Sequence, residues 1–470
     1  MDSPAVESPY ELLLTAALLI PTTHYLLGFL VIAIVFLYNF LEIHFLRDLF
    51  TGFRGQQVEL TFNASSKLYH DVVSKCKILH GRYLSTPWLC SPHLQTLFIH
   101  RFGNAPLVNY RRQLLTTADG GTLALDWVIH DDDVKKPTVT VDDALQHDGE
   151  NPIIIIIPGL SSDSDSAYVK HLAFKMAKRS WNVVVSNHRG CGGVSLTSDW
   201  FYHGGWTGDI RTVVKHLHIQ YPKAPLFIVG TSIGANMLVF YLGEDGVNVP
   251  ITGAAAICSP WDPLICDRFL KRGFIQPFYS RALAFGLKRY AYLHKAVISR
   301  IGNWEGVEKS RYCRDFDDSA FRILADCKTV DTYYRCGCSS NVVGNVMVPL
   351  LCISALDDPI CTNEAIPWDE CRSNGNVVLA TTQHGGHLPF FEGLTANSLW
   401  WVRAVDEYFT VLQSSLWSNP KKEVSYGNGK KDGNGIQHHE GTNGIQHHEG
   451  TKHTEEDLIC GQEKQNAKMD

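Results

Sequence analysis

Charge is scarce in this chain of 470 residues, since only 19% are Asp, Glu, Lys or Arg against 45% hydrophobic residues. So little charge excludes a wholly disordered protein and leaves enough apolar material for a large core. No long run of Lys and Arg occurs, and the net charge is −6, so we expect no binding to nucleic acid. The 13 cysteines are odd in number and thinly spread. They do not form the dense, paired framework of a small secreted domain, and we expect reduced, mostly buried thiols.

Positive charge is also missing from the N-terminus, where the first Lys or Arg is Arg47 and residues 12–41 carry no charge at all. A helix of about 20 residues, over 22–41, spans ~30 Å, the hydrocarbon thickness of a bilayer. A cleaved signal peptide would need a positive start and a small-residue cleavage site, and neither is present. Residues 1–50 are therefore expected to be a retained membrane anchor. The alternative is a buried or peripheral hydrophobic helix.

The distribution of cations around this segment indicates an orientation. Arg47, Arg54 and Lys67 all follow it. Because cytoplasmic flanks are enriched in Lys and Arg, the pattern favours a single-pass membrane protein with its main domain in the cytosol. The endoplasmic reticulum is a candidate membrane.

The residues after the anchor predict alternating strands and helices. Residues 111–130 indicate two strands joined by a turn at 119–121. Five consecutive isoleucines at 153–157 are typical of a strand buried on both faces. Further strands are expected at 181–186, 225–230, 251–257, 349–354 and 376–380, with helical stretches such as 171–179 and 209–220 between them. The sequence therefore predicts an α/β fold with a mostly parallel central sheet flanked by helices.

These patterns divide the chain into four parts. We expect a linker and N-terminal extension at 51–110 and the α/β domain at 111–415. An insertion at about 260–345 interrupts the regular spacing. It is either a helical lid over a site at the edge of the sheet or extra helices packed beside the sheet. Residues 416–470 read as a disordered tail, in which NGIQHHEGT at 434–442 is repeated at 443–451. Its paired histidines offer metal binding as the alternative.

The strongest motif is G-x-S-x-G at 230–234, which follows an apolar strand and opens a helix-like run. The strand-to-helix turn is so sharp that a Cβ at either glycine would clash. It raises the hydroxyl of Ser232 above the sheet and leaves the N–H of Ile233 free at the helix N-terminus. We therefore expect Ser232 to be a nucleophile. The alternative is an ordinary tight turn.

A serine hydroxyl needs a base, and in this arrangement the acid and the base follow it in that order along the chain. Asp357 and Asp358 come directly after the strand at 349–354, and Asp358 is the preferred acid. His387 follows a Gly-Gly pair that lets its loop fold over the nucleophile, and it is the preferred base. Asp357 and His384 remain as rivals.

Two N–H donors are needed to stabilise a developing oxyanion. Ile233, the residue after the nucleophile, supplies one. Leu160, in the loop that follows the isoleucine strand, is expected to supply the other, and Gly159 permits a close approach of the backbone to substrate.

Several further motifs carry a resemblance that covers residues 87–409, about two thirds of the chain. They are PHLQTL at 92–97, DGGTLALDW at 119–127, PGL at 158–160, NHRGCGG at 187–193, the nucleophile block, DDP at 357–359 and GGH at 385–387. With these motifs the chain resembles the α/β-hydrolase family of plant embryogenesis-associated protein 8, the bacterial YheT-type esterases and the animal hydrolase-domain proteins 1, 2 and 3. The resemblance implies that Ser232, Asp358 and His387 form the triad. Many members also have an N-terminal membrane anchor.

The resemblance implies a serine carboxylesterase or lipase, and animal members are associated with acylglycerols and phospholipids. We therefore expect a membrane-anchored hydrolase of acyl esters that needs no metal and no organic cofactor. Two alternatives remain open. The same acyl-enzyme intercepted by an alcohol would make the protein an acyltransferase, and a hydrolase fold with little turnover would make it a receptor for a small ligand.

Overall fold

The structure is a computed structural model that describes residues 8–129 and 150–415. The polar segment at 130–149 and the repeated tail at 416–470 lie outside the described residues. The twelve cysteines within the described residues are all free, in agreement with the expected reduced thiols.

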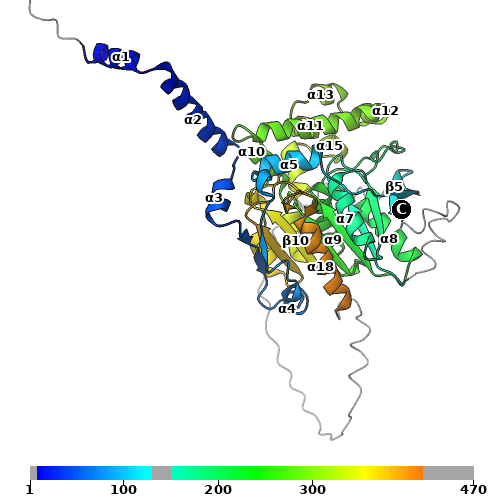
Figure 1. The fold of residues 1–470 in the computed structure, drawn as a ribbon. Coiled ribbons are helices and arrows are strands. Elements are labelled where there is room, and N and C mark those ends of the chain that lie inside the picture. The colour runs from blue at the N-terminus through cyan, green and yellow to red at the C-terminus, as the bar shows by residue number, and fades with distance from the viewer. Residues whose placement is uncertain (1–7, 130–149, 416–470) are drawn as a thin grey trace, which may run out of the picture.

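A nine-stranded sheet forms the centre of the molecule, with the strand order β2-β11-β10-β9-β8-β6-β7-β5-β4 (Figure 1). Its strands are, in chain order, β2 (Glu59–Phe62), β4 (Tyr110–Thr116), β5 (Thr122–Val128), β6 (Ile153–Ile157), β7 (Asn182–Asn187), β8 (Leu226–Thr231), β9 (Gly253–Ile257), β10 (Leu350–Ala355) and β11 (Val377–Thr382). Six consecutive strands of this order are parallel to one another: β11, β10, β9, β8, β6 and β7. The hairpin β4–β5 and the strand β2 add antiparallel edges. The predicted mostly parallel α/β sheet is confirmed.

The isoleucine strand β6 shows why the sheet is buried on both sides. Successive side chains of a strand point to opposite faces. Ile153, Ile155 and Ile157 accordingly enter one apolar core, and Ile154 and Ile156 enter the other. A strand in the middle of such a sheet has no polar face, so an unbroken apolar run is what it requires.

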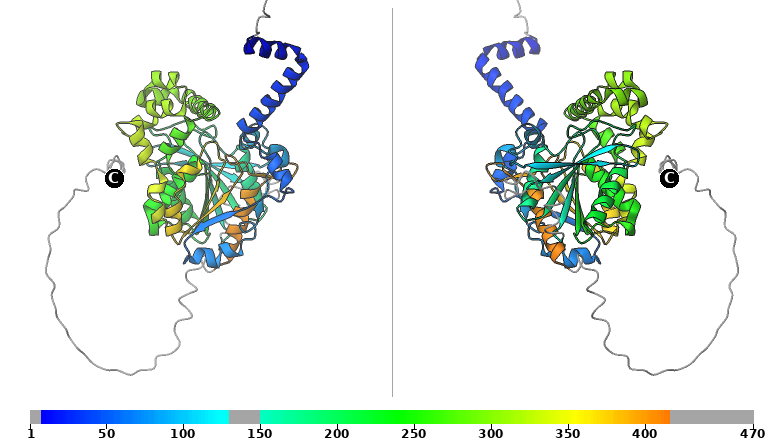
Figure 2. Two further views of the ribbon diagram at one scale, coloured as in Figure 1. Left: turned by 90° about the vertical axis from the view of Figure 1, so that its left-hand side faces the viewer. Right: turned by 90° about the vertical axis from the view of Figure 1, so that its right-hand side faces the viewer.

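Helices cover both faces of the sheet (Figure 2). One core includes residues of α8 (Gly208–Gln220), α9 (Ile233–Asp245) and α17 (Trp368–Ser373). The opposite core includes residues of α4 (Lys67–Asp71), α5 (Pro92–Arg101), α7 (Ala167–Ala177) and α18 (Trp400–Ser414).

The long segment between β9 and β10 is an insertion made of helices. They are α10 (Pro263–Leu270), α11 (Gln276–Leu293), α12 (Lys295–Ile301), α13 (Trp304–Lys309), α14 (Cys313–Ser319), α15 (Phe321–Leu324) and α16 (Val330–Cys336). The predicted helical insertion is confirmed.

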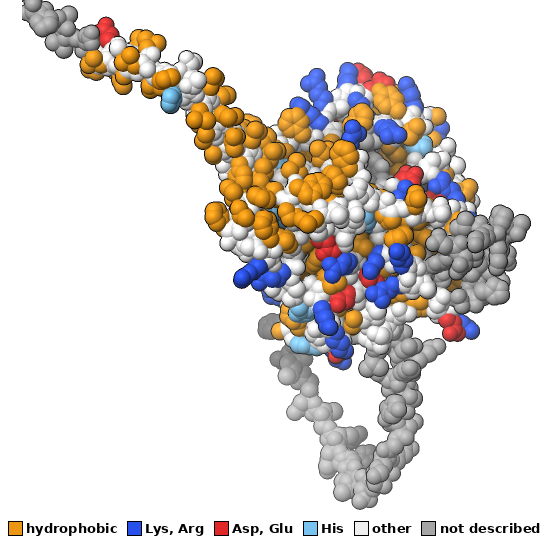
Figure 3. Space-filling model, in the orientation of Figure 1, with side chains coloured by type: hydrophobic (Ala, Val, Ile, Leu, Met, Phe, Trp, Pro, Cys, Tyr) orange, Lys and Arg blue, Asp and Glu red, His pale blue; other side chains and the backbone are white. Residues whose placement is uncertain are grey.

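The N-terminal segment projects away from the sheet as α1 (Pro9–Leu19) and α2 (Thr22–Phe40), followed by α3 (Phe45–Phe50) (Figure 1). Within the described residues, α2 is the one helix long and apolar enough to cross a membrane. None of its residues is buried against the rest of the protein. Figure 3 shows its hydrophobic side chains continuing into those of the globular part.

The segment at 51–110, expected as a linker and extension, is built into the domain. Its strand β2 pairs with β11 and extends the sheet at that edge. Two-residue strands β1 (Gln56–Gln57) and β3 (Arg82–Tyr83) pair with each other. The strand β2 is only four residues long, and its exposed and partly buried residues do not alternate clearly. The sequence pattern therefore does not predict it.

Candidate active site

Ser232 occupies the sharp turn between β8 and α9. Its backbone has φ 54° and ψ −123°, a strained conformation that costs about 1–3 kcal/mol and is held by the surrounding fold. A Cβ on Gly230 would lie 2.7 Å from the Cα of Ala235, and one on Gly234 would lie 2.6 Å from the carbonyl oxygen of Ile157. Both glycines are therefore required by the close approach of the backbone, as expected from the motif.

The three residues named from the sequence are in contact. The Oγ of Ser232 lies 2.9 Å from Nε2 of His387, and Nδ1 of His387 lies 2.8 Å from Oδ2 of Asp358. His387 and Asp358 are each 4% exposed. The N–H groups of Ile360 and Cys361 both donate to Oδ1 of Asp358 at 2.8 Å. The carboxylate is thus held by donors on one oxygen and presents the other to the imidazole.

The rival residues form a separate pair beside the first. Nδ1 of His384 lies 3.1 Å from Oδ2 of Asp357, and the N–H of Gly386 donates to Oδ1 of the same carboxylate at 3.0 Å. The His384 ring stacks on His44, with ring centres 3.7 Å apart, and His44 in turn bonds Asp48 at 2.6 Å. This second pair therefore supports the loop that carries His387 and does not contact Ser232 in the hydrogen bonds of the described residues.

Helix α5 also positions the loop of His387. The backbone N–H of His387 donates to Oγ1 of Thr96 at 3.0 Å, and that hydroxyl donates to the carbonyl of Pro92 at 2.7 Å. A Cβ on Gly386, whose φ is +61°, would lie 2.8 Å from both acceptor oxygens. The role of Thr96 was missed by the sequence analysis. The only signal for it was its place in the motif at 92–97.

The loop after β6 approaches Ser232 closely. A Cβ on Gly159 would lie 3.2 Å from the Cβ of Ser232. Two buried tyrosines anchor the loop, because the N–H of Gly159 donates to the Tyr168 hydroxyl at 2.9 Å and the N–H of Ser161 donates to the Tyr202 hydroxyl at 2.8 Å. Burial raises the pKa of both phenols, so both stay neutral. Neither tyrosine was singled out from the sequence.

Leu160 lies between these two tethered residues, and Ile233 is the first residue of α9. In the described part of the chain the Leu160 N–H has no hydrogen-bond acceptor. The Ile233 N–H has none inside its helix, because the first turn of a helix lacks acceptors. Both residues line one pocket with Ser232. The two expected donors are thus next to the nucleophile.

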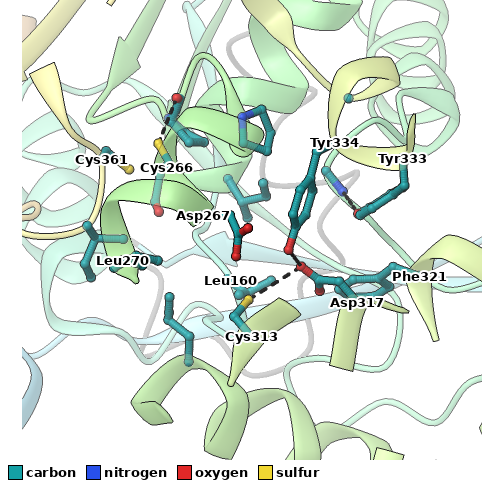
Figure 4. A pocket seen from close by; sticks show the side chains of 18 residues that line it. Leu160, Cys266, Asp267, Leu270, Cys313, Asp317, Phe321, Tyr333, Tyr334 and Cys361 are labelled. Carbon is teal, nitrogen blue, oxygen red and sulfur yellow. Dashed lines mark hydrogen bonds between the residues drawn. The ribbon is translucent and has the colours of Figure 1, made fainter. Parts of the chain in front are cut away.

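That pocket is roofed by the insertion. Besides Ser232 it is lined by residues of α10, α11, α14 and α16, and among these are Leu270, Leu283 and Tyr334 (Figure 4). The volume of the pocket, including the part that is open to solvent, is about 840 Å³. The insertion therefore covers the site, as a lid would, and is more than extra helices beside the sheet.

Two buried carboxyl groups, Asp267 and Asp317, line the mostly apolar pocket. Asp317 is 5% exposed, and its Oδ2 accepts hydrogen bonds from the Tyr334 hydroxyl at 2.5 Å and from Sγ of Cys313 at 3.6 Å (Figure 4). Burial raises the pKa of this carboxyl to about 7. No sequence pattern pointed to it.

A metal ion fits the site poorly. Sγ of Cys258 lies within 4.8 Å of ligand atoms of Asp358 and His387. Burial, together with the nearby Asp358 carboxylate, raises the pKa of the Cys258 thiol well above its ordinary value, whereas metal ligation needs the thiolate. Both nitrogens of His387 are already occupied by Ser232 and Asp358. The donor set is better described as a hydrogen-bonded chain.

Comparison with known proteins gives one family model and several relatives. The model described as serine aminopeptidase, S33, matches residues 150–272. The chain is 34% identical to embryogenesis-associated protein EMB8 of Picea glauca, over 75% of this chain and 78% of that protein. It is 30% identical to the phospholipase ABHD3 of Homo sapiens, over 68% of this chain and 76% of that protein. It is 26% identical to a monoacylglycerol lipase of Saccharomyces cerevisiae, over 70% of this chain and 80% of that protein.

Among solved structures, the esterase Pf2001 of Pyrococcus furiosus matches with a TM-score of 0.40 and 17% identity, over 64% of this chain and 92% of that one.

Proposed function

Because the chain belongs to the α/β-hydrolase family that includes EMB8 of Picea glauca and the phospholipase ABHD3 of Homo sapiens, we propose that it is a serine hydrolase of carboxylic esters. The observation that carries the proposal is the unbroken contact from Ser232 through His387 to Asp358, at 2.9 and 2.8 Å. These distances are those of a nucleophile, a general base and the acid that orients the base.

The geometry supports a two-step mechanism. His387 takes the proton of Ser232 through Nε2 while the hydroxyl oxygen attacks the ester carbonyl carbon. Asp358 holds the imidazole through Nδ1 and stabilises its cationic form. His387 then protonates the departing alcohol. In the second step it deprotonates water, which attacks the acyl-enzyme, releases the acid and restores Ser232.

The negative oxygen of each tetrahedral intermediate is assigned to the N–H groups of Leu160 and Ile233. One such donor lowers a barrier by about 2.7–4 kcal/mol. The hydrogen bonds of Tyr168 and Tyr202 to the residues on either side of Leu160 support this assignment, because they hold the loop in place before substrate arrives. Apart from the water of the second step, every catalytic group named in these steps belongs to the protein.

The proposed substrates are lipid esters, acylglycerols or phospholipids. The pocket next to Ser232 supports this choice, since Leu160, Leu270 and Leu283 give it an apolar wall suited to an acyl chain. Among the relatives, one is named a phospholipase and another a monoacylglycerol lipase.

The proposal also places the protein in a membrane through α2. This helix has 19 residues without a charged side chain, so it is about 28 Å long, close to the hydrocarbon thickness of a bilayer. Arg47 and Arg54 follow it, which supports a cytosolic position of the main domain.

The test is labelling with a fluorophosphonate, followed by intact-mass measurement on the detergent-solubilised full chain. We expect one adduct on the wild type and none on Ser232→Ala. Ser354→Ala is the matched control, because Ser354 is a buried serine whose hydroxyl has no partner within the described residues, and it should label like the wild type. A folded wild type without an adduct would overturn the proposal. Product analysis with a lysolipid acceptor then separates hydrolysis from acyl transfer.

A further inference from the structure

Large hydrophobic side chains are exposed on or directly next to α3, α5 and α11, near the end of α2 (Figure 3). Phe50 is 85% exposed, Phe102 is 71% exposed and Phe285 is 72% exposed. The others that belong to this face are Phe45, Leu46 and Leu49 of α3, Leu97 of α5, and Phe274, Phe278 and Leu293 in or next to α11. We call these side chains, with Phe50, Phe102 and Phe285, the apolar face.

Hydrogen bonds join the elements of the apolar face to one another and to α2. The hydroxyl of Ser91 donates to the carbonyl of Leu41, just past α2, at 2.5 Å. The N–H of His44 donates to the carbonyl of Cys90 at 2.9 Å. Helix α5 is in turn joined to α11, because Nδ1 of His93 in α5 shares a hydrogen bond of 2.9 Å with the hydroxyl of Tyr279 in α11. The direction in which α2 leaves the domain is therefore coupled to the position of α5 and α11.

Helix α11 has the pattern of a helix that lies in a membrane interface. Its inner side buries Ser280, Ala284, Leu287 and Ala291. Its outer side exposes Phe278, Phe285 and Tyr292, which are seven residues apart and so share one side of the helix. A surface groove along this outer side is lined by Arg281, Lys288, Arg289 and Arg311 and by no acidic residue. Exposed aromatic side chains between cations suit the boundary between acyl chains and anionic head groups.

We propose that the apolar face rests on the leaflet into which α2 enters, with α11 lying in the interface. The proposal rests on the proposed function of α2 as an anchor. A lipid surface is favoured over a protein partner because the apolar face is continuous with α2, which must itself be covered by acyl chains. The groove cations also match anionic lipid head groups.

This arrangement implies that the substrate enters the pocket from the membrane. The inner side of α11 contributes Leu283 to the pocket of Ser232, while its outer side carries Phe285. One helix thus separates the leaflet from the pocket. The protein takes a lipid ester directly from the leaflet, so that the single lipid molecule does not pass through water.

The experiment uses the full chain in nanodiscs of phosphatidylcholine and phosphatidylserine. Turnover of a monoacylglycerol embedded in the disc is compared with turnover of soluble p-nitrophenyl butyrate. For Phe278→Glu combined with Phe285→Glu we expect the ratio of lipid to soluble turnover to fall about tenfold, which is about 1.4 kcal/mol. Val247→Glu is the matched control. Val247 is 78% exposed but follows the end of α9 remote from Ser232, and its ratio should not change.

A second measurement does not depend on activity. A photocrosslinking side chain is introduced in place of Phe285, of Val247, or of Leu30 in the middle of α2. Lipid adducts are expected at 285 and 30 and not at 247. Lipid adducts at 30 alone, protein adducts at 285, or an unchanged turnover ratio would overturn the docking of the apolar face. Failure of the wild type to hydrolyse either ester would instead overturn the proposed function, and the crosslinks would still decide the docking.

Discussion

The buried carboxyl of Asp317 makes a strong prediction for the pH dependence of stability. Burial raises its pKa to about 7 in the folded protein, well above the ordinary value of an aspartate carboxyl. Because the folded state holds this proton and the unfolded state releases it near pH 4, the group lowers stability as pH rises between about 4 and 7. Asp317→Asn removes the titration and keeps the shape of the side chain.

The magnitude follows from the pKa difference. A shift of about 3 units corresponds to roughly 4 kcal/mol when the carboxyl is fully ionised. About 2 kcal/mol of this cost is already present at pH 5, because the unfolded state is largely ionised there and the folded state is not. The stability of Asp317→Asn relative to the wild type should therefore rise by about 2 kcal/mol between pH 5 and pH 8.

The assay is denaturant unfolding of the detergent-solubilised full chain at both pH values. Asp318→Asn is the control, since Asp318 lies next in the same helix with its side chain 57% exposed. It should show no such pH dependence. Equal differences between Asp317→Asn and the wild type at pH 5 and pH 8 would refute the reasoning, because they would mean that the folded protein holds the carboxylate as readily as water does.

Three further predictions test the site. Asp358→Asn should slow fluorophosphonate labelling by about 10⁴-fold, as expected for a base held in the wrong tautomer, whereas Asp357→Asn should slow it far less because Asp357 contacts only the supporting loop; similar losses would contradict the assignment. Thr96→Val should slow labelling about tenfold by leaving the His387 N–H without its acceptor, and an unchanged rate would show that α5 does not position the loop. Gly234→Ala should destabilise the fold by about 3 kcal/mol or more, measured by denaturant unfolding, whereas Gly344→Ala, with open space around it, should be neutral.

The sequence alone determined the elements whose local physics is strong. Five isoleucines in a row predict a strand buried on both faces, and β6 sends its side chains into both cores. The G-x-S-x-G spacing predicts a turn with no room for a Cβ, and the contacts of Gly230 and Gly234 have that cause. The order of strands also places Ser232, the two aspartates and the two histidines at one edge of the sheet, because parallel strands end together.

Only the tertiary structure decided how those side chains pair. The sequence favoured Asp358 but left its neighbour Asp357 as a rival, and the folded chain turns so that Asp358 faces His387 and Asp357 faces His384. The acceptor for the His387 N–H comes from Thr96, 291 positions away. The short edge strand β2 and the apolar face around α11 likewise depend on neighbours distant in the chain. Local preference selects turns, strands and helices, whereas partners brought together by the packed sheet select which groups can act.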